Sequence, residues 1–175
     1  MLELLLNRRS IRKYTEEPVA EEQIQKILQA GLLSPSGRNR TPWEFITVQD
    51  KETLTALGKC RHPQQAFLPD TPLAIVVVGN PEATDVWIED CSITMTIMQL
   101  EAQMLGLGSC WIQIRNRMAQ GEAESSSQYV KTLLHIPEAY EVLAILAIGY
   151  PDEEKQPYQL DGLQYGKVHN ERFGK

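Results

Sequence analysis

The sequence of 175 residues is poor in cysteine and histidine, with three of each, and it has no excess of positive charge. Cys60, Cys91 and Cys110 have no paired spacing, which excludes a disulfide framework and a zinc site and is typical of a reducing compartment. Acidic side chains outnumber basic ones by 23 to 17. A general nucleic-acid-binding surface is therefore not expected, because neutralising phosphates needs a basic excess.

Long apolar segments are also missing. The longest unbroken apolar runs, 73–78 and 142–148, are far shorter than the roughly 20 residues that a membrane-spanning helix needs. The N-terminal leucines are interrupted by Glu3 and followed by Arg8 and Arg9, a pattern unlike a secretory signal. We therefore expect a cytoplasmic protein that binds no membrane and folds as one domain over residues 1–175.

Apolar periodicity indicates a mixture of helices and strands. It predicts helices over 1–8, 24–32, 51–59, 83–105 and 119–135, and strands over 43–49, 73–79, 109–114 and 142–149. Residues 10–18 are expected to be extended, and 34–42 to form a loop because small residues and prolines crowd there. Since strict βαβ alternation is absent, the expected fold class is α+β with a mixed, largely antiparallel central sheet flanked by helices.

Two segments indicate a partner subunit. The segment 83–105 is apolar around most of its helical circumference, and such a helix must be buried on nearly all sides. A domain of this size can hardly do that alone, so we expect a dimer. The polar tail 150–175 is too long for a frayed end, and it is predicted to wrap the partner subunit. The helix over 1–8 is expected to turn its leucines inward.

The common templates for catalytic side chains and metals are absent. His62, His135 and His169 are scattered, without a carboxylate at ligand spacing. The glycines at 106 and 108 follow a helix and precede a strand, which is the reverse of the dinucleotide fingerprint. No Gly-x-Ser-x-Gly elbow exists. The sequence therefore predicts neither a metal site nor a side-chain nucleophile.

Three segments are candidates for a ligand site, each with a structural alternative. In an extended chain Arg8, Ser10 and Arg12 project from one side, where two guanidiniums and a hydroxyl suit a phosphate. The alternative is a solvated basic turn after a helix. The segment 34–43 lets the backbone approach a flat ligand, or is an ordinary helix-to-strand connection. The segment 106–112 is a helix end followed by a buried strand, whatever else it does.

Taken together, these segments resemble the nitroreductase family, flavoproteins that bind FMN. The likeness lies in 8–12, in 34–36 with Asn39 and Pro42-Trp43, in 106–111, in 147–151 and in 167–170. The resemblance covers nearly the whole chain. It implies an α+β fold assembled as an intertwined homodimer, with two FMN molecules in the subunit interface.

The resemblance also assigns roles to individual residues. Arg8, Arg9 and Ser10 bind the FMN phosphate and ribityl chain, and Arg12 lies at the N1–C2 carbonyl edge, where a cation stabilises reduced flavin. Other implied contacts are Pro35, Ser36, Arg38 and Asn39 from the other subunit, the backbone of Trp111 and Ile112 at the ring, and Gly149 with Lys155 at the phosphate. The sequence departs from the family pattern at Thr41, at Gln113 and in lacking an arginine shortly after Lys155.

The implied activity is that of an FMN-dependent NAD(P)H oxidoreductase. It reduces quinones, nitroaromatics or similar flat electron acceptors by a ping-pong mechanism, with the chemistry at flavin N5 and no catalytic side chain. Two alternatives stay open. One keeps the fold for another flavin reaction, such as dehydrogenation, reductive dehalogenation or flavin breakdown; the other is a flavin-binding protein without turnover. The sequence chooses neither the acceptor nor between NADH and NADPH.

Overall fold

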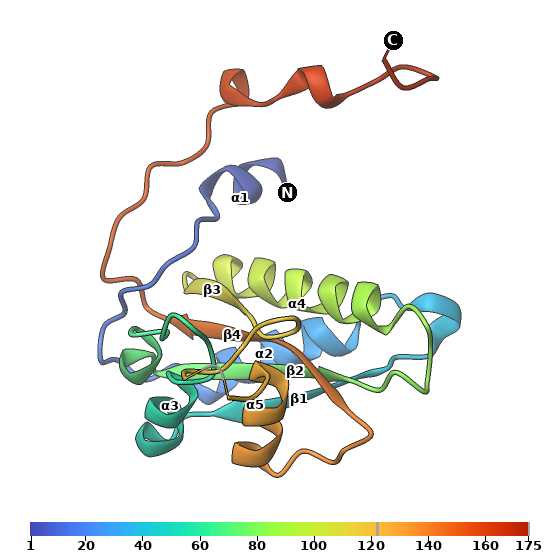
Figure 1. The fold of residues 1–175 in the computed structure, drawn as a ribbon. Coiled ribbons are helices and arrows are strands. Elements are labelled where there is room, and N and C mark those ends of the chain that lie inside the picture. Colours follow the sequence, from blue (N-terminus) through green and yellow to red (C-terminus); the bar gives the residue numbers. More distant parts are fainter. Residues whose placement is uncertain (122, 175) are drawn as a thin grey trace.

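The computed structural model describes residues 1–121 and 123–174 and forms one sheet between two layers of helices (Figure 1). The described helices are α1 (Leu2–Asn7), α2 (Glu21–Leu32), α3 (Lys51–Leu57), α4 (Trp87–Met104) and α5 (Ser126–Leu134). The strands are β1 (Trp43–Val48), β2 (Leu73–Gly79), β3 (Gly108–Gln113) and β4 (Glu141–Gly149). Among these residues no helix combines the length and hydropathy needed to cross a bilayer.

The sheet has the order β1-β2-β4-β3, and every neighbouring pair is antiparallel. β2 is buried along its whole length and β4 at every position after Glu141, because both strands are central and covered on two faces. This position explains their continuous apolar sequences. β3 lies at an edge of the sheet. The expected α+β class with a largely antiparallel sheet is confirmed.

Alternation along the strands sorts the core into two layers. On β2, Ala74, Val76 and Val78 pack in the cluster that contains the buried residues of α3 and α5. Leu73, Ile75 and Val77 pack in the other cluster, against α2 and α4. The sheet is therefore covered by one helix pair on each face (Figure 1).

Two helices begin later than predicted. α4 begins at Trp87 rather than near residue 83, because the Asn80 side chain accepts a hydrogen bond from the Glu82 N–H (2.9 Å) and closes a turn around Pro81. α5 begins at Ser126 rather than at residue 119. The Ser125 hydroxyl caps this helix by accepting from the Gln128 N–H (3.1 Å), so the preceding residues lie outside it.

α1 contacts α4 but lies outside the core, and the C-terminal tail is hydrogen-bonded to the end of α1. Figure 1 shows α1 and the C-terminal tail extending together beyond α4. The leucines of α1 are not turned into a core as predicted: the helix buries no residue within one chain. Met104 of α4 is 68% exposed, and Ile93 is exposed as well. One chain alone therefore leaves α1, part of α4 and the tail without the cover that their apolar residues require.

Candidate functional site

An N-terminal arm, residues 8–15, runs along the edge of the sheet where β3 begins and β4 ends. Ser10 pairs with Ser109 in a parallel bridge, and the Ile11 N–H donates to the Ser109 carbonyl (3.0 Å). At Gly108 a Cβ would lie 2.8 Å from the Ile11 side chain, so only glycine lets the arm lie this close. The arm is thus fixed by main-chain pairing rather than by its charged side chains.

Tyr14 anchors the far end of the arm. Its hydroxyl donates to the Ile11 carbonyl (2.6 Å), and burial raises the pKa of Tyr14, so the hydroxyl remains a donor. Gly149 lies beneath it: a Cβ there would come within 2.6 Å of Pro72 and 2.9 Å of Tyr14. Gly149 therefore permits the close packing that holds the arm against the end of β4.

Arg8, Ser10 and Arg12 are brought together around one point of β3. Arg12 and Arg8 lie close enough to the side chain of Cys110 for their charges to act on its thiol, and Ser10 pairs with the adjacent Ser109. Burial raises the pKa of the Cys110 thiol, and Arg12 and Arg8 oppose that shift. Two guanidiniums and a hydroxyl on one side of an extended segment form a donor set that suits a phosphate or another oxyanion.

Arg9 is engaged elsewhere. Its guanidinium lies over the ring of Tyr158, 4.5 Å from the centroid, and donates to the carbonyl of Gln156. The Tyr158 N–H in turn donates to the Leu6 carbonyl (2.9 Å). In this structure Arg9 holds the tail against the chain's N-terminus, and its predicted role at the cofactor phosphate stays a prediction.

Glu153 is a residue of the site that sequence reasoning missed. One carboxylate oxygen accepts from the Arg12 backbone N–H (2.6 Å), and the other lies 2.6 Å from the Lys155 ammonium. The side chain is only 14% exposed, and these two contacts hold the pKa of Glu153 below its usual range. Glu153 thereby joins the arm to the predicted phosphate ligand Lys155. Nothing in the sequence marks it among its acidic neighbours.

The edge of β3 beyond the arm carries unpaired backbone groups. Because the Ser109 carbonyl bonds to the arm, the backbone groups of Ser109 point away from β4, and those of Trp111 and Gln113 point the same way. Among the described residues, these two N–H groups have no main-chain partner. The backbone groups of Ile112 point toward β4 instead. Trp111 and Gln113 are therefore the residues whose N–H groups can bind the edge of a flat heterocycle.

The side chains of Trp111 and Gln113 are hydrogen-bonded to each other beside this edge. The indole N–H donates to the Gln113 carboxamide oxygen (2.9 Å), and the carboxamide nitrogen donates to the Arg115 carbonyl (3.0 Å). Both polar ends of Gln113 are therefore used within the protein. This departure from the family pattern fixes the indole of Trp111 and presents no free carboxamide to a ligand.

The second predicted cluster, the 34–41 loop, is held by side chains. The Gly37 N–H donates to the carboxylate of Asp90 on α4 (2.9 Å), and the Thr41 N–H donates to the Ser36 hydroxyl (2.9 Å). Arg38, Asn39 and Thr41 all have positive φ angles (53°, 56° and 41°), which is strained for residues other than glycine. The strained backbone presents the exposed side chains of Arg38 and Asn39 to solvent.

The structure separates this loop from the arm. The loop contacts α4 at Asp90, near the start of the helix, whereas the arm packs on Gly108 just after the helix ends. Asp90 and Met104 are about 21 Å apart at roughly 1.5 Å per residue. One ligand therefore cannot contact both clusters of the same chain. It can contact both kinds of cluster only if a second copy of the chain brings its loop to the arm.

Two clefts adjoin the arm. One, of about 720 Å³, is lined by Arg12, Lys13, Tyr14 and residues of the 67–72 segment. The other, of about 190 Å³, is lined by Arg9, Glu153, Lys155 and residues 106–108. No group of three His, Cys, Asp or Glu side chains that could hold a metal ion occurs in residues 1–121 and 123–174.

The protein therefore has an α+β fold, and it carries cationic side chains at one edge of an antiparallel sheet. The sequence model of the nitroreductase family matches residues 5–60 and 57–150. The chain therefore belongs to the nitroreductase family, and the predicted family is confirmed.

Individual relatives agree with this assignment. The solved structure of an FMN-dependent nitroreductase from Clostridium difficile R20291 has 48% sequence identity and a TM-score of 0.95, covering 99% of this chain and 100% of that one. A protein of Archaeoglobus fulgidus with the provisional name NADH dehydrogenase/NAD(P)H nitroreductase is 35% identical over 98% of both chains. A Bacillus subtilis FMN reductase [NAD(P)H] is 28% identical over 86% of this chain and 66% of its own length.

Proposed function

We propose that this protein is a cytoplasmic, FMN-dependent NAD(P)H oxidoreductase that reduces quinones, nitroaromatics or similar flat acceptors. Membership of the nitroreductase family supports the class, and relatives are named for FMN and for NAD(P)H. The observation that carries the proposal is the pairing of the arm with Ser109, which places Arg8, Ser10 and Arg12 at the start of an unpaired strand edge. Three free, buried cysteines suit a reducing compartment.

The residues present fit FMN. Arg8 and Ser10, with Lys155 held by Glu153, would bind the phosphate end through charge-assisted hydrogen bonds. The outward N–H groups of Trp111 and Gln113 would bind the ring edge. Gly149 would complete the site by keeping the arm close to β4. When bound, FMN supplies reversible acceptance of a hydride, so nucleotide and electron acceptor use the same face in turn.

The side chains contribute binding, orientation and charge. Arg12 would hold a positive charge where negative charge develops on reduction, which favours the reduced cofactor. Its backbone is fixed by the bond from its N–H to Glu153 (2.6 Å), so the arm is preorganised. No general base or nucleophile is needed, in keeping with a site built from arginines and backbone amides.

We further propose that the active form is a homodimer of single-domain chains. The separation of arm and 34–41 loop supports this, because Pro35, Ser36, Arg38 and Asn39 would then bind the cofactor held by the partner's arm. The uncovered apolar residues of α4 and of the tail (150–175) support it too, since a partner wrapped by the tail would cover them.

The proposal is tested by a spectrum and an anaerobic titration. Purified protein is expected to be yellow, to release FMN on denaturation and to scatter light as a dimer. NADH or NADPH should bleach the visible band, and a 1,4-benzoquinone should restore it. A band that neither nucleotide bleaches would instead favour a flavin-binding protein without turnover. A colourless protein that takes up no added FMN, or a stable monomer, contradicts the proposal.

A further inference from the structure

A third cleft opens at the end of β3 that is remote from the arm, and we call it the basic cleft. It has a volume of about 580 Å³. Its lining includes Arg115, Asn116 and Arg117 from the segment after β3, Ser125 and Ser127 from the start of α5, and Glu141 from β4. None of these residues belongs to the cofactor site proposed above.

The walls of the basic cleft are held by main-chain hydrogen bonds. The His62 N–H donates to the Met118 carbonyl (2.8 Å), and the Ser126 N–H donates to the Arg117 carbonyl (2.8 Å). The Gln120 N–H donates to the Lys59 carbonyl (3.0 Å). The loops after α3 and β3 therefore support each other and the start of α5, and the cleft is a formed feature of the fold.

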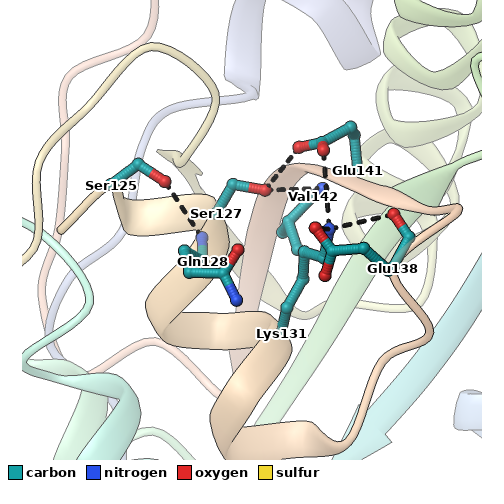
Figure 2. A network of polar contacts seen from close by, with 7 residues as sticks. All are labelled: Ser125, Ser127, Gln128, Lys131, Glu138, Glu141 and Val142. Atoms are coloured by element: carbon teal, nitrogen blue, oxygen red, sulfur yellow. Dashed lines mark hydrogen bonds and ion pairs between the residues drawn. The ribbon is translucent and has the colours of Figure 1, made fainter.

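The acidic residue of the cleft, Glu141, shares a buried lysine with a second glutamate. One oxygen of Glu141 accepts from the Ser127 hydroxyl (2.8 Å), and the other lies 3.5 Å from the ammonium of Lys131. Lys131 is only 3% exposed and also donates to the Glu138 carbonyl (3.1 Å). Figure 2 shows this network, with Lys131 reaching from α5 toward both glutamates. Lys131 also lies 3.1 Å from a carboxylate oxygen of Glu138, so its one positive charge is shared by two carboxylates and offsets only part of the negative charge of Glu141.

The two arginines of the cleft keep their charge available. With the described residues neither Arg115 nor Arg117 forms an ion pair, and Arg117 donates to the carbonyl of Asn116 (2.9 Å). Ser125 adds a hydroxyl at the start of α5, whereas the Ser127 hydroxyl is used by its bond to Glu141. In a chain of net charge −6 this is a local positive site, and paired guanidiniums match phosphate oxygens.

The basic cleft continues the strand edge at which the flavin ring is proposed to bind. Arg115 follows Gln113 by two residues, about 7 Å along an extended chain. The Gln113 carboxamide donates to the Arg115 carbonyl (3.0 Å), so the edge and the cleft are joined directly. A substrate that stacks on the ring and carries a phosphate further along its length would place that phosphate near the arginines.

We infer that the basic cleft binds the diphosphate of the pyridine nucleotide, with Arg115 and Arg117 as the residues that recognise it. This inference rests on the proposed function, because it takes the nicotinamide to stack on the flavin. Lys131 acts indirectly, since it offsets part of the repulsion between the carboxylate of Glu141 and the phosphates.

Calorimetry with ADP tests the cleft without turnover, because ADP carries the diphosphate and no nicotinamide. The FMN-loaded protein is expected to bind ADP, and Arg115→Gln/Arg117→Gln to bind it at least about tenfold more weakly, as the loss of two charge-assisted contacts predicts. Adenosine should bind neither protein. Both arginines lie outside the core, so the variant should keep its melting temperature and FMN content.

A second double variant controls for net charge. Lys26→Gln/Lys59→Gln removes the same two charges from residues that do not line the cleft, and its ADP affinity should equal that of the wild type. Equal ADP affinity in wild type and the arginine variant, or an equal loss in the lysine variant, overturns the inference.

Nucleotide oxidation separates this inference from the proposed function. With a neutral quinone as acceptor, KM for NADH and NADPH should rise about tenfold in the arginine variant. Nucleotide oxidation with unchanged KM and unchanged ADP binding would leave the function standing and reject the cleft. Loss of ADP binding in the variant, in a wild-type protein that oxidises neither nucleotide, would reject the function and retain the cleft as a diphosphate site.

Discussion

The arm and the 34–41 loop, the two regions that the proposed cofactor site combines, are held in place by different means. The arm is extended, its residues have ordinary backbone angles, and main-chain bonds to Ser109 and Tyr150 fix it. The loop has three strained residues and depends on the side chains of Ser36, Arg40 and Asp90. A backbone-held segment keeps its shape when one side chain is removed, whereas a side-chain-held loop does not.

The comparison also concerns distance. The arm packs near the end of α4, and the loop packs near the start of α4. Each chain therefore carries the two halves of the proposed site at opposite ends of one long helix. Substitutions in the arm should therefore remove contacts without moving the backbone. Substitutions in the loop should change the presentation of residues that act in the other subunit.

The largest expected effect is at Arg8. Arg8→Ala should fold with an unchanged melting temperature but bind FMN about 100-fold more weakly, because a charge-assisted contact to phosphate contributes about 1.5–3 kcal/mol. Fluorescence titration of apoprotein with FMN measures this. Lys13→Ala is the matched variant: it removes one exposed positive charge from the same arm at a residue that is not a predicted FMN contact, so FMN affinity should stay close to that of the wild type. Full retention of FMN by Arg8→Ala would move the phosphate site elsewhere.

Co-expression of two defective chains should restore binding. In a mixed dimer of Arg8→Ala with Arg38→Ala/Asn39→Ala, one site carries both defects and the other carries neither. We therefore expect half of the FMN sites of tagged, purified mixed dimers to be filled normally, although each parent homodimer is depleted. FMN content per chain gives the answer. Mixed dimers as empty as their parents would mean that the arm and the loop of one chain serve the same site, which contradicts a site shared between subunits.

A smaller effect is expected at Asp90, which touches no ligand. Its side chain is 4% exposed and accepts from the Gly37 N–H, so Asp90→Ala should release the strained loop and weaken FMN about tenfold. Asp90→Asn keeps an acceptor of the same shape and should bind FMN nearly as wild type does. If both variants bind alike, the loop is held by something other than this bond.

The smallest effect concerns Glu153 and its pH dependence. Its pKa is lowered from the usual 4.5, so the stabilisation that it gives the arm is complete above that pH. This stabilisation is lost as the pH falls through the lower folded-state pKa. Acid titration of bound FMN should show this loss in the wild type and lack it in Glu153→Gln, which should bind FMN about threefold more weakly at pH 7. Identical acid release curves for the two proteins contradict the role.

Much of the fold could be predicted because its signals are local. β2 runs from Leu73 to Gly79 as predicted, since a central strand buried on both faces is continuously apolar. The predicted start of α5 was wrong by seven residues, because Ser125 caps the helix and the apolar positions before it belong to a loop. The leucines of α1 were predicted to be inward, but within one chain the helix contacts α4 without burying any residue.

The site likewise contains some features that the sequence predicted and others that it missed. The alternation of Arg8, Ser10 and Arg12 predicted their common side, because an extended chain has a period of two. The role of Glu153 was missed, because its partner Arg12 is 141 positions away along the chain. The direction in which the backbone N–H of Trp111 points depends on the register between the arm and β3. A single sequence does not display that register.

The amino-acid sequence by itself determined most of the elements, the α+β class and the family, because periodicity and short motifs are properties of neighbouring residues. Only the tertiary structure decided which charges meet. It placed Glu153 between the Arg12 backbone N–H and the Lys155 ammonium, set Lys131 against Glu138 and Glu141, and put the arm and the 34–41 loop at opposite ends of α4. These pairings join residues that are distant in the chain, and packing of the whole fold alone brings them within hydrogen-bonding reach.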